Sequence, residues 1–160
     1  MAQPIPTGHH TITPHLTVKG ASEAIEFYKR AFGAEEISRL PVPNPDGQEK
    51  LGHAALRIDD SRLFLADECP EFGAMGPTGN PPMTMHLYVT DADAAFDRAV
   101  KAGATVRMSL ADMFWGDRYG LVVDPFGHNW SIATRKEDLT PDQMRERMAA
   151  AFRKPVSASA

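Results

Sequence analysis

Two histidines occupy the same place in a pattern that occurs twice in the chain. His15 begins the segment His-Leu-Thr-Val at residues 15–18, and His86 begins His-Leu-Tyr-Val at residues 86–89, 71 positions later. An imidazole gains and loses its proton near neutral pH and is a common metal ligand. Three interpretations are open for this pair: the rings contact or protonate a ligand, they bind a metal ion, or they line a cavity while hydrogen-bonded to neighbouring side chains.

A second candidate group surrounds Arg118, which follows Trp115 closely. Alternation along a strand places Arg118 on the same face as Val122, and we interpret this face as the lining of a cavity. A guanidinium beside aromatic surface suits an anionic or carbonyl ligand. The alternative is an ion pair with Asp117 or Asp124 that fixes the loop.

The repeated pattern extends beyond the two histidines. Each copy is followed by a stretch with helical spacing of apolar residues, over 22–32 and 91–102, and each stretch ends at a Gly-Ala pair. Further along, the strand-like segments 61–66 and 128–133 each follow a turn. Three matches in the same order predict a duplicated module of about 70 residues that contains a strand, a helix and three more strands.

The first strand of each module alternates between apolar and polar side chains. In the first module, Ile12, Leu16 and Val18 form the apolar face that covers the helix. The polar faces of the two first strands carry Thr13, His15 and Thr17 in one module and Thr84, His86 and Tyr88 in the other. His53 is expected on the same polar side, where a structural hydrogen bond explains it at least as well as ligand contact.

Capping residues and prolines predict where elements begin and end. Ser22 and Asp91 are predicted N-caps, and residues 140–143, Thr-Pro-Asp-Gln, fit a capping box at the start of a third helix. Proline and glycine predict loops over residues 41–46, 70–82 and 112–117.

Composition excludes several classes of protein. A chain of 160 residues is long enough for one well-packed domain, in which we expect Tyr28, Phe32 and Trp130 to be core residues, the tryptophan under the second helix. The net charge of −4 argues against nucleic-acid binding. The single cysteine, Cys69, excludes an internal disulfide. Without a membrane-length apolar run or a secretory signal pattern, we expect no membrane association and a cytoplasmic location.

Three segments carry a resemblance to a known family: Ile-Glu-Phe-Tyr-Lys-Arg-Ala-Phe-Gly-Ala at 25–34, Trp-Gly-Asp-Arg-Tyr-Gly at 115–120 and Asp-Pro-Phe-Gly-His at 124–128. Together with the duplicated module, they resemble the vicinal oxygen chelate superfamily, and within it the PhnB-like branch. That superfamily includes glyoxalase I, bleomycin-resistance proteins, fosfomycin-resistance enzymes and extradiol dioxygenases.

The resemblance implies an α+β fold in which two tandem βαβββ modules form a cupped half-barrel, with helices outside, a ligand cavity inside and a C-terminal helix added. It implies one domain over residues 1–154, with modules at about 12–68 and 84–135. The Ser/Ala composition beyond Pro155 predicts a flexible tail at 155–160. The resemblance also implies a homodimer. Because this fold hosts lyases, transferases, oxygenases and pure binders, whether the chain is an enzyme stays open.

The metal-dependent members of this superfamily place a His or Gln on the first strand of each module and a Glu on the last strand. The matching positions here are Thr13, Thr84 and Ser131, with Phe64 as the echo of Ser131 in the first module. These side chains are not the imidazole, thiolate or carboxylate donors that transition metals need, so we expect no metal cofactor. If a divalent metal binds at a shifted site, the candidate ligands are His15, His86 and Glu68, although Glu68 is equally well explained as a solvated strand-end charge.

The sequence therefore favours a homodimeric, metal-free protein of the bleomycin-resistance type that binds a small organic molecule. We expect His15 and His86 to approach each other in a cavity lined by Thr13, His15, Thr17, His53, Thr84, His86, Tyr88, Trp115, Arg118 and Ser131. Two alternatives remain: a metal-dependent lyase or dioxygenase, and a metal-free acid–base enzyme that uses His15 and His86.

Overall fold

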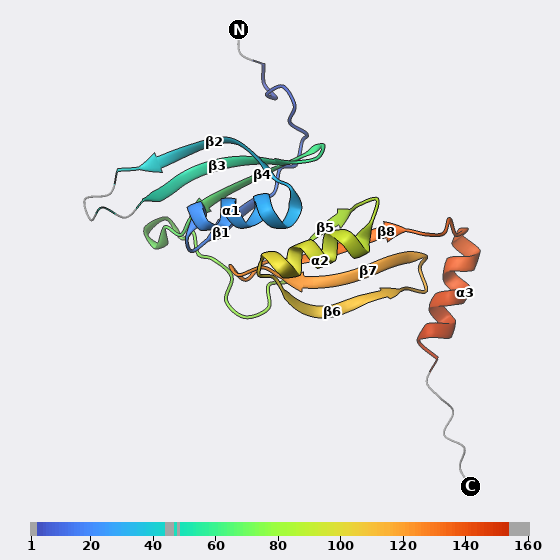
Figure 1. Ribbon diagram of the computed structural model, residues 1–160. Helices are drawn as coiled ribbons and strands as arrows, with labels where there is room; N and C mark the ends of the chain where they lie inside the picture. The colour runs from blue at the N-terminus through green and yellow to red at the C-terminus, as the bar shows by residue number, and fades with distance from the viewer. Residues whose placement is uncertain (1–2, 44–46, 48, 154–160) are drawn as a thin grey trace.

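Two consecutive βαβββ modules and a final helix make up the computed structural model, which describes residues 3–43, 47 and 49–153 (Figure 1). The first module contains β1 (His15–Val18), α1 (Ala21–Phe32), β2 (Glu35–Val42), β3 (Lys50–Ile58) and β4 (Ser61–Asp67). The second contains β5 (Thr84–Tyr88), α2 (Ala92–Ala102), β6 (Thr105–Asp112), β7 (Asp117–Val123) and β8 (Asn129–Arg135), and is followed by α3 (Pro141–Ala151). The duplicated module and the α+β fold class are therefore confirmed.

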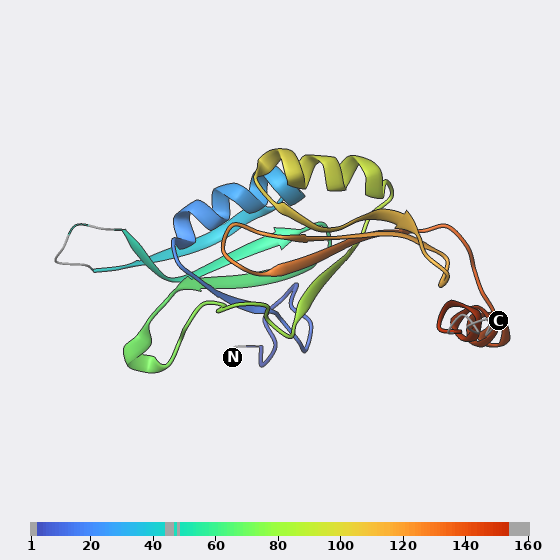
Figure 2. The same cartoon turned by 90° about the horizontal axis from the view of Figure 1, so that it is seen from below.

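Each module forms one four-stranded mixed sheet, and the strand order is the same in both. The orders are β1-β4-β3-β2 and β5-β8-β7-β6, with the first and last strand of each module parallel and the other neighbours antiparallel. Helices α1 and α2 pack against each other and lie on one side of the two sheets (Figure 2). The other side of each sheet, which we call its free face, is the surface on which the histidines lie.

The first strand is shorter than expected. It begins at His15 rather than Ile12, and Ile12 is 84% exposed instead of lying on the apolar face. Pro14 precedes the strand and has no amide hydrogen to donate to a ladder, although its carbonyl accepts a hydrogen bond from the Phe64 amide at 2.9 Å. Proline is therefore suited to the start of this edge strand and the chain before it follows a different path.

Helix α1 also begins differently from the prediction. Ser22 is not its N-cap; the helix begins at Ala21, after Gly20 in a left-handed conformation. The Asp67 carboxylate at the end of β4 accepts hydrogen bonds from the Gly20 and Ala21 amides, both at 2.9 Å. This distant carboxylate satisfies the first amides of the helix, so no local cap is needed.

The other two helix starts are confirmed. The Asp91 side chain accepts a hydrogen bond from the Ala94 amide at the start of α2, and the capping box of α3 is complete between Thr140 and Gln143. Residues 70–82 and 113–116 connect strands as predicted, the first with a single turn of 3₁₀ helix at Pro70–Phe72. Strand β2 extends to Val42, so it takes in part of the predicted 41–46 loop, whose residues 44–46 lie outside the described part of the chain, as does the predicted tail at 155–160.

The core joins the two modules. Tyr28, Phe32 and Trp130 are buried as expected, but the ring neighbours of Trp130 are Tyr28 and Phe32 of α1 rather than residues of α2. One oxygen of the buried Asp124 accepts hydrogen bonds from the Tyr28 hydroxyl at 2.7 Å and the Trp130 indole at 2.8 Å. Burial, and then the neighbouring Asp124 carboxylate, raise the pKa of Tyr28.

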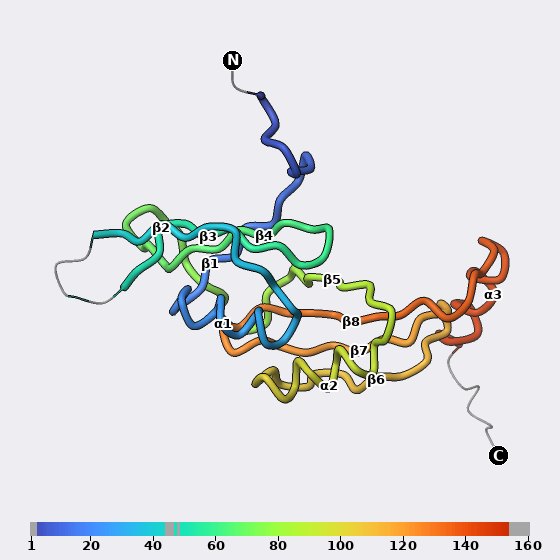
Figure 3. The backbone as a smooth tube through the Cα atoms, turned by 45° about the horizontal axis from the view of Figure 1, so that its top comes forward, coloured from blue at the N-terminus to red at the C-terminus, as the bar shows by residue number. Residues whose placement is uncertain are grey.

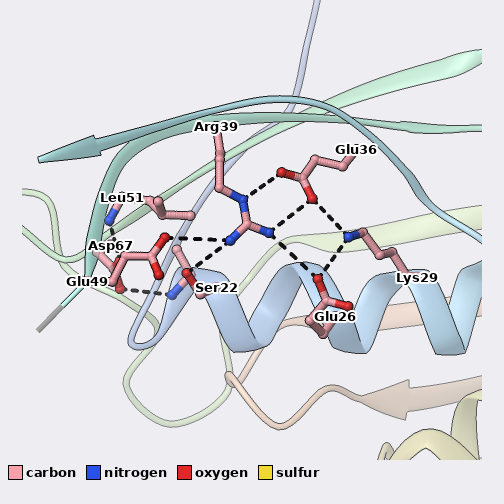
Figure 4. Close-up of polar contacts among 9 residues, drawn as sticks. Ser22, Glu26, Lys29, Glu36, Arg39, Glu49, Leu51 and Asp67 are labelled. Atoms are coloured by element: carbon pink, nitrogen blue, oxygen red, sulfur yellow. Dashed lines mark hydrogen bonds and ion pairs between the residues drawn. The ribbon is translucent and has the colours of Figure 1, made fainter.

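An ion-pair network ties α1 to β2 on the helix side of the first sheet (Figure 4). The Glu36 carboxylate lies 2.8 Å from the Lys29 ammonium and 2.6 Å from the Arg39 guanidinium. Hydrogen bonds from Arg39 first, and then from Lys29, lower the pKa of Glu36 to about 2.

Candidate functional site

The free face of the first sheet carries a cluster of aromatic rings. The strand register places His15 beside Phe64, and Phe64 beside Ala55 two residues after His53. The ring of His53 is 4.8 Å from that of Phe64 and 6.2 Å from that of His15. Neighbouring residues such as Leu16 and Leu65 point to the opposite side and are buried in the core. We call His15, Thr17, His53 and Phe64 the first face.

The free face of the second sheet is built in the same way with different side chains. His86 lies beside Ser131 in the register, and its Nδ1 atom is 2.7 Å from the Ser131 hydroxyl. The His86 ring is 4.5 Å from that of Tyr88 and stacks on that of Tyr119 at 6.0 Å. We call Thr84, His86, Tyr88, Tyr119 and Ser131 the second face.

Equivalent strand positions thus hold different chemistry in the two modules. Phe64 and Ser131 match because each lies opposite the histidine of the first strand, and His53 matches Tyr119 by the same register. The echo of Ser131 in the first module is therefore Phe64, as the sequence indicates.

Charge differs between the faces as well. Partial burial, and then the neighbouring His53, lower the pKa of His15, so its ring is neutral at pH 7. On the second face the Tyr88 hydroxyl donates a hydrogen bond to the Asp117 carboxylate at 3.2 Å. Partial desolvation of the hydroxyl, and then the Asp117 charge, raise the pKa of Tyr88. Both faces thus present aromatic and imidazole rings, and the Asp117 carboxylate lies beside those of the second.

Arg118 lies on the opposite side of the second sheet from this site, so its predicted place in the cavity is wrong. It does share a side with Val122, but that side faces α2, where Val122 is fully buried. The Arg118 guanidinium donates hydrogen bonds to both oxygens of Asp93 on α2, at 2.7 and 3.0 Å, and approaches Asp112 at 3.5 Å. The ion-pair alternative is correct in kind, but the partners are Asp93 and Asp112 rather than Asp117 or Asp124.

The same alternation identifies Tyr119, which the sequence analysis missed. Since Arg118 faces the helix, Tyr119 faces the other way. The apolar type of Val122, which shares the Arg118 face by alternation, is the sequence signal that could have shown this. Trp115 lies in the turn between β6 and β7 with its ring 5.4 Å from that of Tyr119, which places it at one end of the second face. Thr13 lies before β1, in the N-terminal segment, rather than on the strand.

Within one chain the two faces stay apart. Among the ring contacts between described residues, His15 touches only rings of the first module and His86 only rings of the second. The expected approach of His15 to His86 is therefore not found in a single chain. His86 and Tyr88 instead border a cleft of about 960 Å³ between the modules, which residues of the first module such as Gly33 and Ile58 close on the other side.

The donor set does not suit the divalent metal of the metal-dependent relatives. Thr13, Thr84, Ser131 and Phe64 offer no imidazole, thiolate or carboxylate at the expected ligand positions. The Glu68 carboxylate of the alternative site accepts a hydrogen bond from the Gly76 amide at 2.9 Å instead of joining the histidines. Over residues 3–43, 47 and 49–153, no three His, Cys, Asp or Glu side chains are grouped so that they could hold a metal ion.

The described helices are too short or too polar to cross a lipid bilayer.

Comparison with known proteins gives the family. The family model described as "Glyoxalase/Bleomycin resistance protein/Dioxygenase superfamily" matches residues 8–132. The Mycobacterium bovis protein Mb0911c is 48% identical over 144 residues, which cover 87% of this chain and 92% of that protein.

Solved structures agree. PA1353 from Pseudomonas aeruginosa is 28% identical, with a TM-score of 0.65 over 81% of this chain and all of that chain (100%). A PhnB protein from Bacillus cereus, 21% identical, shares the fold with a TM-score of 0.63 over 78% of this chain and 99% of that one. The chain belongs to the glyoxalase/bleomycin resistance protein/dioxygenase superfamily, the vicinal oxygen chelate superfamily that its sequence resembles.

Proposed function

We propose that this protein binds a small, ring-containing organic molecule in the cytoplasm, without a divalent metal, and that it does so as a homodimer. The observation that carries the proposal is the pair of equivalent free faces, each of which presents aromatic and imidazole rings around a first-strand histidine. Flat rings make large, specific contacts with planar ligands, and a few polar atoms such as the Ser131 hydroxyl orient them.

The dimer follows from the openness of the two faces. A small-molecule site normally buries most of the ligand surface, whereas an open sheet contacts one side only. Tyr88 on the second face is 65% exposed, and Leu40, which neighbours His53, is 60% exposed. A twofold axis that sets the first face of one copy against the second face of its partner covers both faces and makes two equal sites.

One observation favours a second candidate function, proton transfer by His86. The contact between Nδ1 and the Ser131 hydroxyl fixes the ring and leaves Nε2 available to a ligand. A general acid or base needs this kind of orientation. In this reading Ser131 is a positioning residue, and the first face holds the substrate.

A thermal-shift screen of planar organic compounds, followed by calorimetry on variants, tests the proposal. His86→Ala and Tyr119→Ala remove rings of the second face and are expected to weaken binding of a hit about tenfold or more. Arg118→Ala is the matched control, because Arg118 lies on the helix side of the same strand as Tyr119. Equal loss in all three variants, or stoichiometric metal in the purified protein that is needed for binding, would contradict the proposal. Turnover of a hit that disappears in His86→Ala would support the proton-transfer candidate instead.

A further inference from the structure

The N-terminal segment, residues 3–14, lies on the free side of the first sheet, opposite α1 (Figures 2 and 3). Two contacts hold it there. The Arg62 guanidinium on β4 donates a hydrogen bond from Nε to the Gly8 carbonyl at 2.8 Å, and the His9 ring lies 5.5 Å from the Phe64 ring of the first face. We call residues 3–14 the strap.

The path of the strap is specific at Gly8. This residue has a φ of +79°, and a Cβ atom placed on it would lie 2.7 Å from Nη2 of Arg62. Any other residue would therefore be strained and would also displace the guanidinium. The next residue, His9, closes a turn onto the Pro6 carbonyl at 3.1 Å and is half-buried, whereas its neighbour His10 is exposed.

The strap adds the His9 ring to the first face, and Arg62 of β4, which holds the strap, adds a cation. With His9, three imidazoles surround Phe64: those of His9, His15 and His53. Arg62 is half-buried and belongs to none of the ion pairs found within the described ranges. Its Nε atom is used by Gly8, which leaves the Nη groups for a ligand.

The second face differs in the charges next to its rings. The carboxylate of Asp117, which is only 6% exposed, accepts the hydrogen bond of Tyr88 there. The Arg135 guanidinium, opposite Asp117 in the strand register, also acts on Tyr88, so charges of both signs lie beside the second face. An acidic group on a ligand is therefore attracted more strongly to Arg62 on the first face, where no ion pair within the described ranges occupies the cation. This difference gives a bound molecule one favoured orientation between two faces that share a fold.

We infer that the strap completes the binding site, and that the ligand class is a planar aromatic molecule with an acidic group. In this arrangement His9 contacts the aromatic rings, and Arg62 binds the acid while it holds the strap. The inference rests on the proposed function, since it names the ligand that the ring-bearing faces take.

Two fluorescent probes with the same rings test the inference. 1-Anilinonaphthalene-8-sulfonate carries an acidic group, and N-phenyl-1-naphthylamine is its neutral counterpart. His9→Ala is expected to weaken binding of both probes about tenfold, and His10→Ala, the adjacent exposed histidine, to weaken neither. Arg62→Gln keeps an N–H donor for Gly8 but removes the charge, and is expected to weaken the sulfonate about tenfold while leaving the neutral probe unchanged.

A second variant keeps the test decisive if His9→Ala alters the fold. Gly8→Ala keeps every ring of the site but strains the strap and displaces the Arg62 guanidinium, so the affinity for both probes should fall while circular dichroism stays that of the parent. Parent-like affinities in His9→Ala and Gly8→Ala would overturn the inference, and the proposed function would still stand if His86→Ala loses binding. Parent protein that binds neither probe would also overturn it, and the wider screen would then decide the proposed function separately.

Discussion

Register partners of the two first-strand histidines differ between the modules: Phe64 in the first and Ser131 in the second. In the first module His15 therefore lies against the apolar ring of Phe64, and partial burial, and then the neighbouring His53, lower its pKa. In the second, a hydroxyl at 2.7 Å fixes the His86 ring. The strand order and the placement of each helix on one side of its sheet are shared, so the duplication preserved the side of each sheet that folds the protein. The free side diverged, which is where a ligand-binding surface changes without loss of the fold.

The helix sides show a similar contrast in how each helix is held. In the first module an acid lies between two cations, since Glu36 pairs with Lys29 of α1 and Arg39 of β2. In the second module a cation lies between two acids, since Arg118 of β7 pairs with Asp93 of α2 and Asp112 at the end of β6. In both modules ion pairs join the helix to the sheet, but the central group is an acid in the first module and a cation in the second.

The largest expected effect concerns the turns between the last two strands of each module. Asp124 in the β7–β8 turn is buried and accepts hydrogen bonds from Tyr28, Trp130 and two amides of its own turn. Asp124→Asn turns one acceptor into a donor and leaves a buried donor without a partner. The free energy of unfolding should fall by about 3 kcal/mol, measured by urea titration.

The control is Asp59→Asn at the matching turn of the first module. Asp59 is exposed and has a φ of 50°, which asparagine tolerates. Its free energy of unfolding should stay within about 0.5 kcal/mol of the parent. Equal losses at both turns would show that the modules are not joined through Asp124.

The caps of α1 and α2 should differ by a smaller amount. Asp67 accepts three amide hydrogen bonds, from Gly20, Ala21 and Leu51, whereas the equivalent Thr134 accepts one, from Ala92. We expect Asp67→Ala to lower the free energy of unfolding by about 2 kcal/mol and Thr134→Ala by about 1 kcal/mol. The reverse order, measured by thermal or urea unfolding, would contradict the view that the first helix depends on a distant carboxylate.

The Glu36 network makes stability depend on pH. The pKa of the Glu36 carboxyl is lowered from 4.5 in the unfolded chain to about 2 in the folded protein. The stabilisation from this network is therefore complete above pH 4.5 and is lost as the pH falls from 4.5 towards 2. In urea titrations over this range, the parent should lose stability more steeply than Glu36→Gln. The difference between them should shrink in high salt, because the pairs are partly exposed. Parallel pH profiles would show that the network does not stabilise the fold.

The smallest expected effect concerns the hydrogen bond between His86 and Ser131, which has no equivalent at His15 within the described part of the chain. Ser131→Ala frees the His86 ring and should weaken binding of a ligand about fivefold, the equivalent of one neutral hydrogen bond. Ser22→Ala, on the helix side of the first sheet, should leave the affinity unchanged. Calorimetry with a hit from the screen measures both, and unchanged affinity in Ser131→Ala would remove Ser131 from the site.

Local patterns in the sequence predicted the parts of the fold that depend on local physics. The 71-residue echo predicted the two modules, and Asp91 and Thr140 predicted two helix starts because their side chains cap amides three residues away. The start of α1 could not be found in this way, since its cap, Asp67, is 46 residues distant from Ala21.

The site was predicted less completely, for a related reason. Strand alternation identifies two faces but does not say which one the helix covers. Arg118 was assigned to the wrong face on this account and Tyr119 was missed, although His86, Tyr88 and Ser131 were placed together correctly. The strap was missed because its contacts, from Gly8 to Arg62 and from His9 to Phe64, join residues more than 50 positions apart.

A subunit-mixing experiment tests most directly whether the site lies between the first face of one copy and the second face of another. One variant, Phe64→Ala, disables the first face, and another, Tyr119→Ala, disables the second. The two are co-expressed with different affinity tags, and the mixed dimer is purified through both. Each homodimeric variant should bind the best hit of the screen weakly, whereas the mixed dimer should regain about half of the parent's sites at parent affinity, because one of its two sites joins two intact faces. A mixed dimer that binds no better than either variant, or a parent protein that is monomeric while it binds, would contradict the account.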